Sequence, residues 1–313
     1  MMAIRLIPVV AWALAGAFAL LAFATAAAAL LARLRPERNY VELKLRIRTW
    51  WLIAIGFFVA VPFSRTVSVV ALALVSFVAF KEFLSLVPTR RADCKVLLWA
   101  YLAIPLQYFW AWIGWYGMFI VFIPVYVFLL LPMRMVLIGE TQGFLRSAAI
   151  VQWGLMIAVF SLSHMAFLLA LPQPADAHYD GVSLLFYIVF LTEFNDVAQY
   201  VWGKCLGRRQ AVPTVSPNKT CEGLLGGVAT TTLLGWLAAP WLTPLHGYEA
   251  ATAGLLIGVA GFVGDIVMSA IKRDVGVKDS GAVLPGHGGV LDRLDSLTFT
   301  APLFFHYVYY LHY

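Results

Sequence analysis

Only 12% of the 313 residues are charged and 62% are hydrophobic, whereas a soluble domain carries about 25% charged residues. So few charges cannot cover a water-facing surface, and the composition therefore predicts that lipid surrounds most of the chain. The net charge of +6 does not indicate a nucleic-acid-binding protein, because the basic residues lie between apolar runs and form no stripe with interleaved aromatic residues.

Apolar runs follow one another along the whole chain, and about 20 apolar residues in a helix cross a bilayer. These runs predict an all-α polytopic membrane protein with about ten transmembrane helices. The second and third runs are short and are separated by Pro62, Ser64 and Arg65, so nine spans are also conceivable. The predicted spans are residues 6–32, 48–64, 66–80, 96–112, 115–132, 147–171, 182–203, 223–242, 251–270 and 296–312.

The basic residues test this division, because Lys and Arg concentrate in cytoplasmic loops. With the N-terminus on the non-cytoplasmic side, 20 of the 22 Lys and Arg residues fall in cytoplasmic loops, and only Arg5 and Arg65 fall elsewhere. The proposed outer loop, residues 172–181, contains Asp176 and Asp180 and no basic residue. The charge pattern therefore predicts that both termini lie on the non-cytoplasmic side.

Residues 41–51 alternate apolar and charged side chains, a pattern typical of a β-strand. A single strand beside a membrane has no partner for its backbone, so we expect an interfacial segment attracted to anionic lipid instead. The polar motifs are concentrated in the second half of the chain. We therefore divide it into N-terminal membrane helices, residues 1–146, and C-terminal membrane helices, residues 147–313, which carry two catalytic loops at 204–222 and 271–295.

Three carboxylates lie inside predicted spans of the second half, namely Glu193, Asp196 and Asp265. An ionisable group facing lipid costs a few kcal/mol, so such groups mark functional sites by default. The alternative is a buried salt bridge or hydrogen bond to a neighbouring helix. Asp196 and Asp265 fall toward the cytoplasmic ends of their spans, next to the basic loops that follow.

The first of these loops contains a candidate anion site. Ser216 is a plausible helix N-cap, with Pro217 at the favoured first-turn position. A helix N-terminus with a hydroxyl, the Asn218 amide and the Lys219 ammonium can bind an anion. The alternative is a capped interfacial helix whose lysine only sets the topology.

The second loop follows Asp265 and is richer in polar residues than a connecting loop requires. Asp265, Ser269 and Lys272 are spaced so that they share one helix face. Lys272 and Arg273 together can grip phosphate. Asp265 and Asp279 could hold Mg²⁺, which needs few carboxylates when water and substrate phosphate complete its shell.

His287 lies in a glycine-rich part of the same loop. It could act as an acid, a base or a ligand, or it could be only a hydrogen-bond partner. Phosphoryl transfer depends mainly on positioning and charge neutralisation and does not require a histidine base.

With these two loops the sequence resembles the phosphatidate cytidylyltransferase (CDP-diacylglycerol synthase) family over about residues 190–300. A short family element in the first loop is matched by Ser216, Pro217, Lys219, Thr220, Glu222 and Gly223. The long C-terminal signature of the family is matched by Ser269, Lys272, Arg273, Lys278, Asp279, Gly281, Pro285, Gly286, His287, Gly288, Gly289, Asp292, Arg293 and Asp295.

The resemblance implies a reaction in which CTP and phosphatidic acid give CDP-diacylglycerol and pyrophosphate with the help of Mg²⁺. It implies an enzyme of a bacterial inner membrane with its active site facing the cytoplasm, and a chain that could form a homodimer. The implied catalytic residues are Asp265, Asp279, Lys272 and Arg273, and the implied metal ligands are Asp265, Asp279 and Asp196. The implied substrate contacts are Ser216, Asn218, Lys219, Ser269, Lys278, His287 and Arg293.

One segment departs from the family pattern. Many members have Asp-[Ser/Thr]-x-Ala-Tyr, whereas this chain reads Asn195-Asp196-Val197-Ala198-Gln199-Tyr200. The departure keeps open a different CTP-using lipid enzyme, such as a polyprenol kinase or an ether-lipid cytidylyltransferase. A transporter is the alternative from another class, but its expected matching halves are not seen in this sequence.

Overall fold

The structure is a computed structural model, and it describes residues 8–34, 40–60, 64–88, 90, 94–173, 177–281, 283–284 and 288–313. The described chain is mainly helical, with one small two-stranded sheet. The N-terminal part contains α1 (Pro8–Leu34), α2 (Val41–Ala60), α3 (Arg65–Leu86), α4 (Cys94–Ile113), α5 (Tyr116–Val121), η2 (Phe122–Val127) and α6 (Phe128–Val136). The remainder contains α7 (Phe144–Leu155), η3 (Met156–Ser161), α8 (Leu162–Leu168), α9 (Gly181–Leu206), β1 (Gln210–Val212), β2 (Ser216–Thr220), α10 (Cys221–Leu242), α11 (Gly247–Asp274), α12 (Leu291–Leu294) and α13 (Leu297–His312).

Eight helical segments among the described residues are long and apolar enough to cross a membrane. The π-helical turns η2 and η3 lie within two of these segments, so α5 to α6 and α7 to α8 each form one span. The prediction of a helical polytopic membrane protein is therefore confirmed. The total of ten spans stays a prediction, because α2 and the 16-residue α13 lie outside these eight.

The alternating segment at 41–51 belongs to α2, so its strand-like pattern does not produce a strand. A helix satisfies its own backbone hydrogen bonds, which a lone strand next to lipid cannot do. The short predicted spans two and three are separate helices. The second of them begins at Arg65 because the Ser64 side chain accepts a hydrogen bond from the Val67 amide at 3.2 Å.

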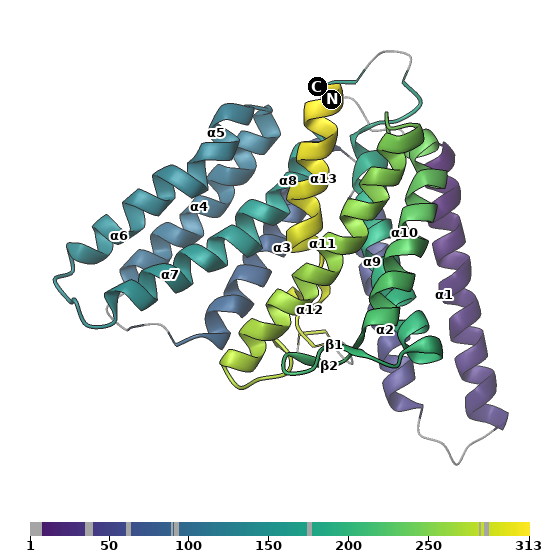
Figure 1. Ribbon diagram of the computed structural model, residues 1–313. Coiled ribbons are helices and arrows are strands. Elements are labelled where there is room, and N and C mark those ends of the chain that lie inside the picture. Colours follow the sequence, from purple (N-terminus) through teal and green to yellow (C-terminus); the bar gives the residue numbers. More distant parts are fainter. Residues whose placement is uncertain are drawn as a thin grey trace.

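Figure 1 shows the helices as one bundle, with β1, β2 and α12 together at one end of it. The first turn of α1 and the last turn of α13 lie at the opposite end, which is the arrangement that an even number of crossings requires. The hairpin and the α11–α12 connection therefore lie at the same end of the molecule, as expected for two loops on one side of a membrane.

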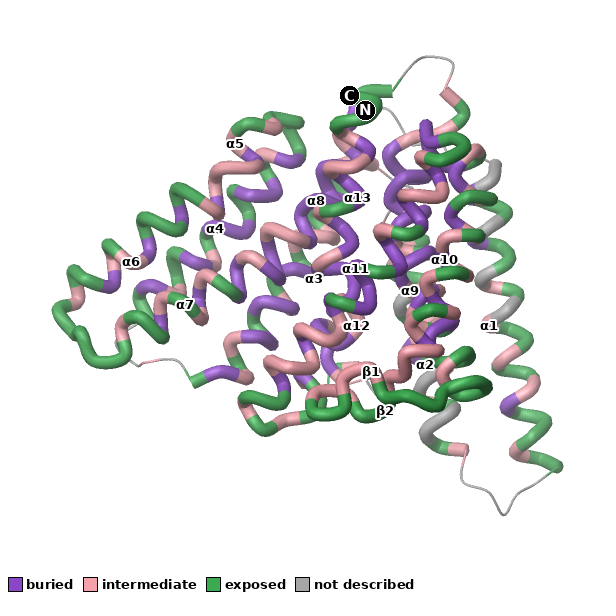
Figure 2. The backbone as a smooth tube through the Cα atoms, viewed as in Figure 1, coloured by how far each residue is buried: buried purple, intermediate pink, exposed green. Residues whose placement is uncertain are grey.

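The most buried part of the bundle lies where α3, α8, α9 and α13 meet, whereas α1 is exposed along most of its length (Figure 2). In the C-terminal part, glycines allow α9, α10 and α11 to approach closely. A Cβ added at Gly254 would lie 2.8 Å from the Thr232 Cα, and one added at Gly227 would lie 2.3 Å from the Gln199 Cγ. Tight packing of these three helices fixes the residues near their ends.

Candidate active site

The first loop forms a hairpin that places Lys219 at the start of α10. Strand β2 pairs antiparallel with β1, and the Thr220 side chain accepts a hydrogen bond from the Gly223 amide at 3.0 Å. The N-cap of α10 is therefore Thr220 and not Ser216, and the N-cap prediction for Ser216 was wrong. Ser216 instead begins β2, because its backbone pairs with Val212 of β1. The chain then stays extended through Thr220.

Lys219 joins this hairpin to the second loop. Its ammonium forms an ion pair with the Asp265 carboxylate of α11 at 2.5 Å. It also donates a hydrogen bond to Gln199 Oε1 of α9 at 3.3 Å and lies 5.4 Å from the centre of the Phe262 ring. The two segments that sequence reasoning singled out separately thus meet at one ion pair.

Asp265 is one of three acidic residues that we call the carboxylate cluster, together with Asp196 of α9 and Asp295 at the end of α12. Ser269 donates to Asp265 at 3.2 Å, so the predicted shared face of α11 is confirmed for these two residues. Ser296 donates to Asp196 Oδ2 at 3.0 Å, while Asp196 Oδ1 is buried with no hydrogen-bond partner in the described part of the chain.

Asp295 shows how closely these charges interact. Its burial raises its pKa well above the usual range of a carboxyl, and the negative charges of Asp265 and Asp196 raise this pKa further. Lys272 and the Ser296 amide, which donates to Asp295 Oδ1 at 2.8 Å, oppose that shift only in part. The cluster therefore concentrates more negative charge than its protein partners neutralise.

This excess of carboxylate oxygen is the donor set that Mg²⁺ prefers, since Mg²⁺ binds through one or two carboxylates plus water and substrate phosphates. The unpartnered Asp196 Oδ1 and the repulsion felt by Asp295 both fit an added cation. Across the described ranges no three His, Cys, Asp or Glu side chains lie close enough to hold a metal ion by themselves. The residues present fit a cation whose shell the substrate completes.

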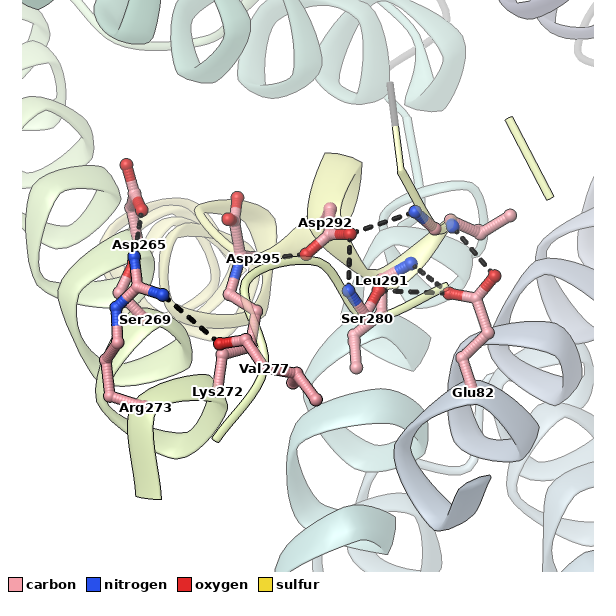
Figure 3. Close-up of polar contacts among 12 residues, drawn as sticks. Glu82, Asp265, Ser269, Lys272, Arg273, Val277, Ser280, Leu291, Asp292 and Asp295 are labelled. Atoms are coloured by element: carbon pink, nitrogen blue, oxygen red, sulfur yellow. Dashed lines mark hydrogen bonds and ion pairs between the residues drawn. The ribbon is translucent and has the colours of Figure 1, made fainter. Parts of the chain in front are cut away.

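A second set of polar residues is fully paired, and we call it the anchor network: Glu82, Lys272, Ser280 and Asp292. Figure 3 shows Lys272 pointing to Asp292, with Glu82 reaching toward Ser280 and Leu291 from the other side. Lys272 Nζ contacts Asp292 Oδ1 at 2.8 Å, and the second carboxylate oxygen accepts from the Ser280 and Gly289 amides at 2.7 and 2.9 Å.

The charges in the anchor network are balanced, in contrast to those of the cluster. Burial alone would raise the pKa of Asp292. The Lys272 ammonium and the amides of Gly289 and Ser280 outweigh it, so the pKa lies below its usual value. Lys272, which sequence reasoning placed on the substrate, is only 8% exposed and holds this aspartate. In the structure Lys272 thus ties the second loop to α11, and its predicted contact with the substrate stays a prediction.

Glu82 ties the same loop to α3, in the N-terminal part of the chain. Its carboxylate accepts hydrogen bonds from the Val290 and Leu291 amides at 2.9 and 2.8 Å, and Ser280 Oγ lies 3.4 Å away. A Cβ at Gly289 would lie 2.5 Å from Glu82 Oε2. Gly288 has a φ of +79°, and a Cβ there would lie 2.6 Å from Asp292 Oδ2. These two glycines let both carboxylates reach the loop backbone.

The other predicted site residues are distributed as follows. Arg273 donates to the Val215 and Val277 carbonyls at 3.4 and 3.2 Å and so braces the two loops against each other. Arg293 is partly buried, lies in the electrostatic range of Asp196, and its Nε has no hydrogen-bond partner among the described residues. Exposed positions are occupied by Asn218, Lys278 and Asp279.

The catalytic, substrate-binding and metal-binding roles that the sequence predicts for these residues stay predictions, because contacts within the chain do not test them. No polar contact within the described ranges joins Asp279 to Asp265, so their sharing of one cation stays a prediction. His287 lies outside the described residues.

Sequence reasoning missed four residues of this site: Glu82, Gln199, Asp292 and Asp295. The two aspartates stand in the signature that carries the family resemblance, so a signal for them was available. Glu82 and Gln199 lie in apolar helices, and no motif distinguishes them. Only their contacts identify them.

Comparison with known proteins places these contacts in context. The sequence model described as the cytidylyltransferase family matches residues 44–311. A protein of Escherichia coli (strain K12) named YnbB, described as uncharacterized, is 48% identical over 297 residues, which is 95% of this chain and 97% of that protein.

Two enzymes named phosphatidate cytidylyltransferase are similar over a shorter stretch. The one from Synechocystis is 49% identical over 114 residues, 36% of this chain and 39% of that enzyme. The one from Haemophilus influenzae is 40% identical over 137 residues, 42% of this chain and 47% of that enzyme. The chain thus matches less than half the length of each, and the family resemblance indicated by the two motifs is confirmed.

Proposed function

Because the chain belongs to the cytidylyltransferase family, we propose that it is a phosphatidate cytidylyltransferase, which converts CTP and phosphatidic acid into CDP-diacylglycerol and pyrophosphate. The observation that carries this proposal is the ion pair between Lys219 and Asp265, because it joins both motifs at one end of the helix bundle. The lipid substrate is suggested by the relatives that are named for it.

The reaction forms a bond between a phosphate oxygen of the lipid and the α-phosphorus of CTP. The bond from that phosphorus to the oxygen bridging the α- and β-phosphates breaks, and pyrophosphate leaves with the bonding electrons. Both substrates are polyanions, so catalysis depends on bringing them together and neutralising charge. Lys219 lies beside the carboxylate cluster, and the partly buried Arg293 adds a second positive charge near Asp196.

In this proposal magnesium would be held by one or two carboxylates of the cluster of Asp265, Asp295 and Asp196, with water and substrate phosphate completing its shell. Magnesium, when bound, supplies positive charge to the phosphate oxygens and lowers the repulsion between the two substrates. The chain itself orients the groups around it. Ser269 and Ser296 donate to the cluster, and the Lys219 ammonium lies against Asp265, where phosphate oxygens could exchange contacts with it.

The anchor network keeps this geometry in place. Asp292 and Asp295 are separated by one helical turn of α12, so fixing Asp292 to Lys272 also fixes Asp295. We assign the end of the bundle that carries β1, β2 and α12 to the cytoplasmic side of a bacterial inner membrane. That assignment rests on the basic residues of the two loops and on the cytoplasmic source of CTP.

Purified protein incubated with labelled CTP, phosphatidic acid and Mg²⁺ tests the proposal. We expect labelled CDP-diacylglycerol and an equal amount of pyrophosphate. Asp265→Asn should reduce the rate at least ~1000-fold, because the carboxylate that would hold magnesium is lost and the charge of the reacting phosphates is no longer neutralised. The matched control is Asp274→Asn, an exposed residue on the same helix, with a rate within about twofold of the unmodified enzyme.

Each possible failure has its own meaning. Release of CDP in place of pyrophosphate would indicate a CTP-dependent lipid kinase. Turnover of a different lipid with pyrophosphate release would keep the chemistry and change the substrate. Equal rates for Asp265→Asn and Asp274→Asn would show that the site lies elsewhere.

A further inference from the structure

Gln199 is a buried amide next to the ion pair between Lys219 and Asp265, and it stands where the family pattern of the sequence has alanine. Its side chain is 5% exposed. Its Oε1 accepts a hydrogen bond from Lys219 Nζ at 3.3 Å. Its Nε2 is buried and has no hydrogen-bond partner in the described part of the chain. Half of the amide is therefore paired with the site, and the other half is available to a ligand.

The packing around Gln199 fixes its side chain in this position. A Cβ at Gly227 would lie 2.3 Å from Gln199 Cγ, and a Cβ at Gly223 would lie 2.8 Å from the Gln199 carbonyl oxygen. Both glycines belong to the first two turns of α10, which begins at Cys221, two residues after Lys219. The close approach of α9 and α10 leaves little room for the Gln199 stem to move, so the amide is held ready next to Lys219.

A second unpartnered atom lies one turn earlier on α9. Asp196 and Gln199 are three residues apart, so they share one face of the helix. Lys219 interacts with both residues, through a hydrogen bond to Gln199 and through its charge on Asp196. A buried donor without a partner costs about 1–3 kcal/mol. A buried unpaired donor therefore calls for a partner from outside the chain, which is a ligand or a water molecule.

We propose that Gln199 binds a phosphate oxygen of the substrate through Nε2 while Oε1 positions Lys219 for the same anion. The inference rests on the function proposed above and adds a residue to it. The ligand must be an acceptor, because a carboxamide NH₂ only donates. A neighbouring ammonium selects an anionic acceptor, and phosphate is the anion that both substrates share. The phosphate belongs to CTP or to the lipid, and the kinetic constants distinguish them.

Two near-isosteric substitutions separate the two halves of the amide. Gln199→Glu keeps an oxygen for Lys219 and replaces the donor with a negatively charged acceptor. Gln199→Met removes both polar atoms and keeps an unbranched stem, which the contact with Gly227 requires. The matched control is Gln107→Met in α4: Gln107 is also fully buried, donates to the Phe119 carbonyl and Ser163 Oγ, and has an unpartnered Oε1 in the described chain.

The measurement is kcat and KM for CTP and for phosphatidic acid, each with the other substrate saturating, together with the thermal midpoint of every purified variant. We expect Gln199→Met to raise one of the two KM values about 10-fold and Gln199→Glu to raise the same one about 100-fold, as loss of a hydrogen bond to a charged group and addition of a like charge predict. The substrate whose KM rises is the one that Gln199 binds. Gln107→Met should change neither KM by more than about twofold, whatever its effect on the thermal midpoint.

The inference would be overturned if Gln199→Glu kept both KM values within about twofold of those of the unmodified enzyme. It would also be overturned if Gln199→Met lost activity only in proportion to its lowered thermal midpoint and left both KM values unchanged. An inactive unmodified enzyme would instead refute the proposed function. The two failures are therefore distinguishable in one set of experiments.

Discussion

The anchor network and the carboxylate cluster are built from the same kinds of residue and differ in how well those residues are paired. In the anchor network, every oxygen of Glu82 and Asp292 accepts a hydrogen bond or contacts an ammonium. In the cluster, Asp196 Oδ1 has no partner among the described residues, and Asp295 is repelled by two like charges. The two aspartates of α12 thus have pKa values shifted in opposite directions, although they lie one helical turn apart.

This difference separates scaffold from site. A fully satisfied buried network contributes rigidity, whereas buried polar groups that are left unsatisfied mark places where a protein gives up stability for binding or catalysis. Substitutions that preserve shape and remove one charge should therefore have opposite effects on stability in the two regions. The following predictions are ordered by their effect on the free energy of unfolding.

Asp292→Asn should have the largest effect, because it leaves the buried Lys272 ammonium without its carboxylate. Removing one partner of a buried ion pair destabilises a protein by about 3–5 kcal/mol. A thermal or denaturant unfolding curve of the protein in detergent measures the change. The lowered pKa of Asp292 adds a pH dependence. Its stabilising contribution is complete above the unfolded-state pKa of about 3.9 and is lost as the pH falls through the folded-state pKa, so the difference from the variant should shrink only in acid.

The same substitution at Asp295 is the matched control for Asp292→Asn, since Asp292 lies in α12, Asp295 is the C-cap of that helix, and both are almost completely buried. Equal destabilisation by the two changes would show that the contrast between the regions has no energetic meaning.

Glu82→Gln should have a smaller effect of about 1–3 kcal/mol. A carboxamide offers one acceptor oxygen, so either the Val290 or the Leu291 amide is left facing an NH₂ group. The control is Glu222→Gln, because Glu222 also accepts from two consecutive amides, those of Arg208 and Arg209, but near the surface. Glu222→Gln should destabilise the protein less than Glu82→Gln does, because water can replace the lost hydrogen bond. A larger loss of unfolding free energy in Glu222→Gln than in Glu82→Gln would contradict this prediction.

The sequence was sufficient to predict a helical membrane protein and the two loops, because apolar length and clustered basic residues are local patterns. It also predicted the shared face of Asp265 and Ser269, which depends only on the helical repeat. It could not predict that Glu82 holds a loop about 200 residues further along the chain, because that contact depends on how distant helices pack. The Ser216 N-cap was wrong for a related reason. Pairing with β1 keeps residues 216–220 extended, and this tertiary preference overrides the local capping signal.

Asp295→Asn should have the smallest effect on stability and the opposite sign. Burial and the charges of Asp265 and Asp196 raise the pKa of Asp295, so the folded state disfavours its ionised form. A neutral amide can keep the hydrogen bond from the Ser296 amide and removes the repulsion. Without added metal, we therefore expect the variant to be more stable by about 1 kcal/mol.

Mg²⁺ should then reverse the order. A cation that binds only the folded state stabilises it in proportion to its concentration relative to the dissociation constant, so added Mg²⁺ should raise the thermal midpoint of the unmodified protein and leave that of Asp295→Asn almost unchanged. The variant should also lose CTP-dependent turnover despite its higher stability. A variant that is less stable without metal, or that responds to Mg²⁺ as the unmodified protein does, would place Asp295 in the scaffold with Asp292. The cation would then have to be held without it.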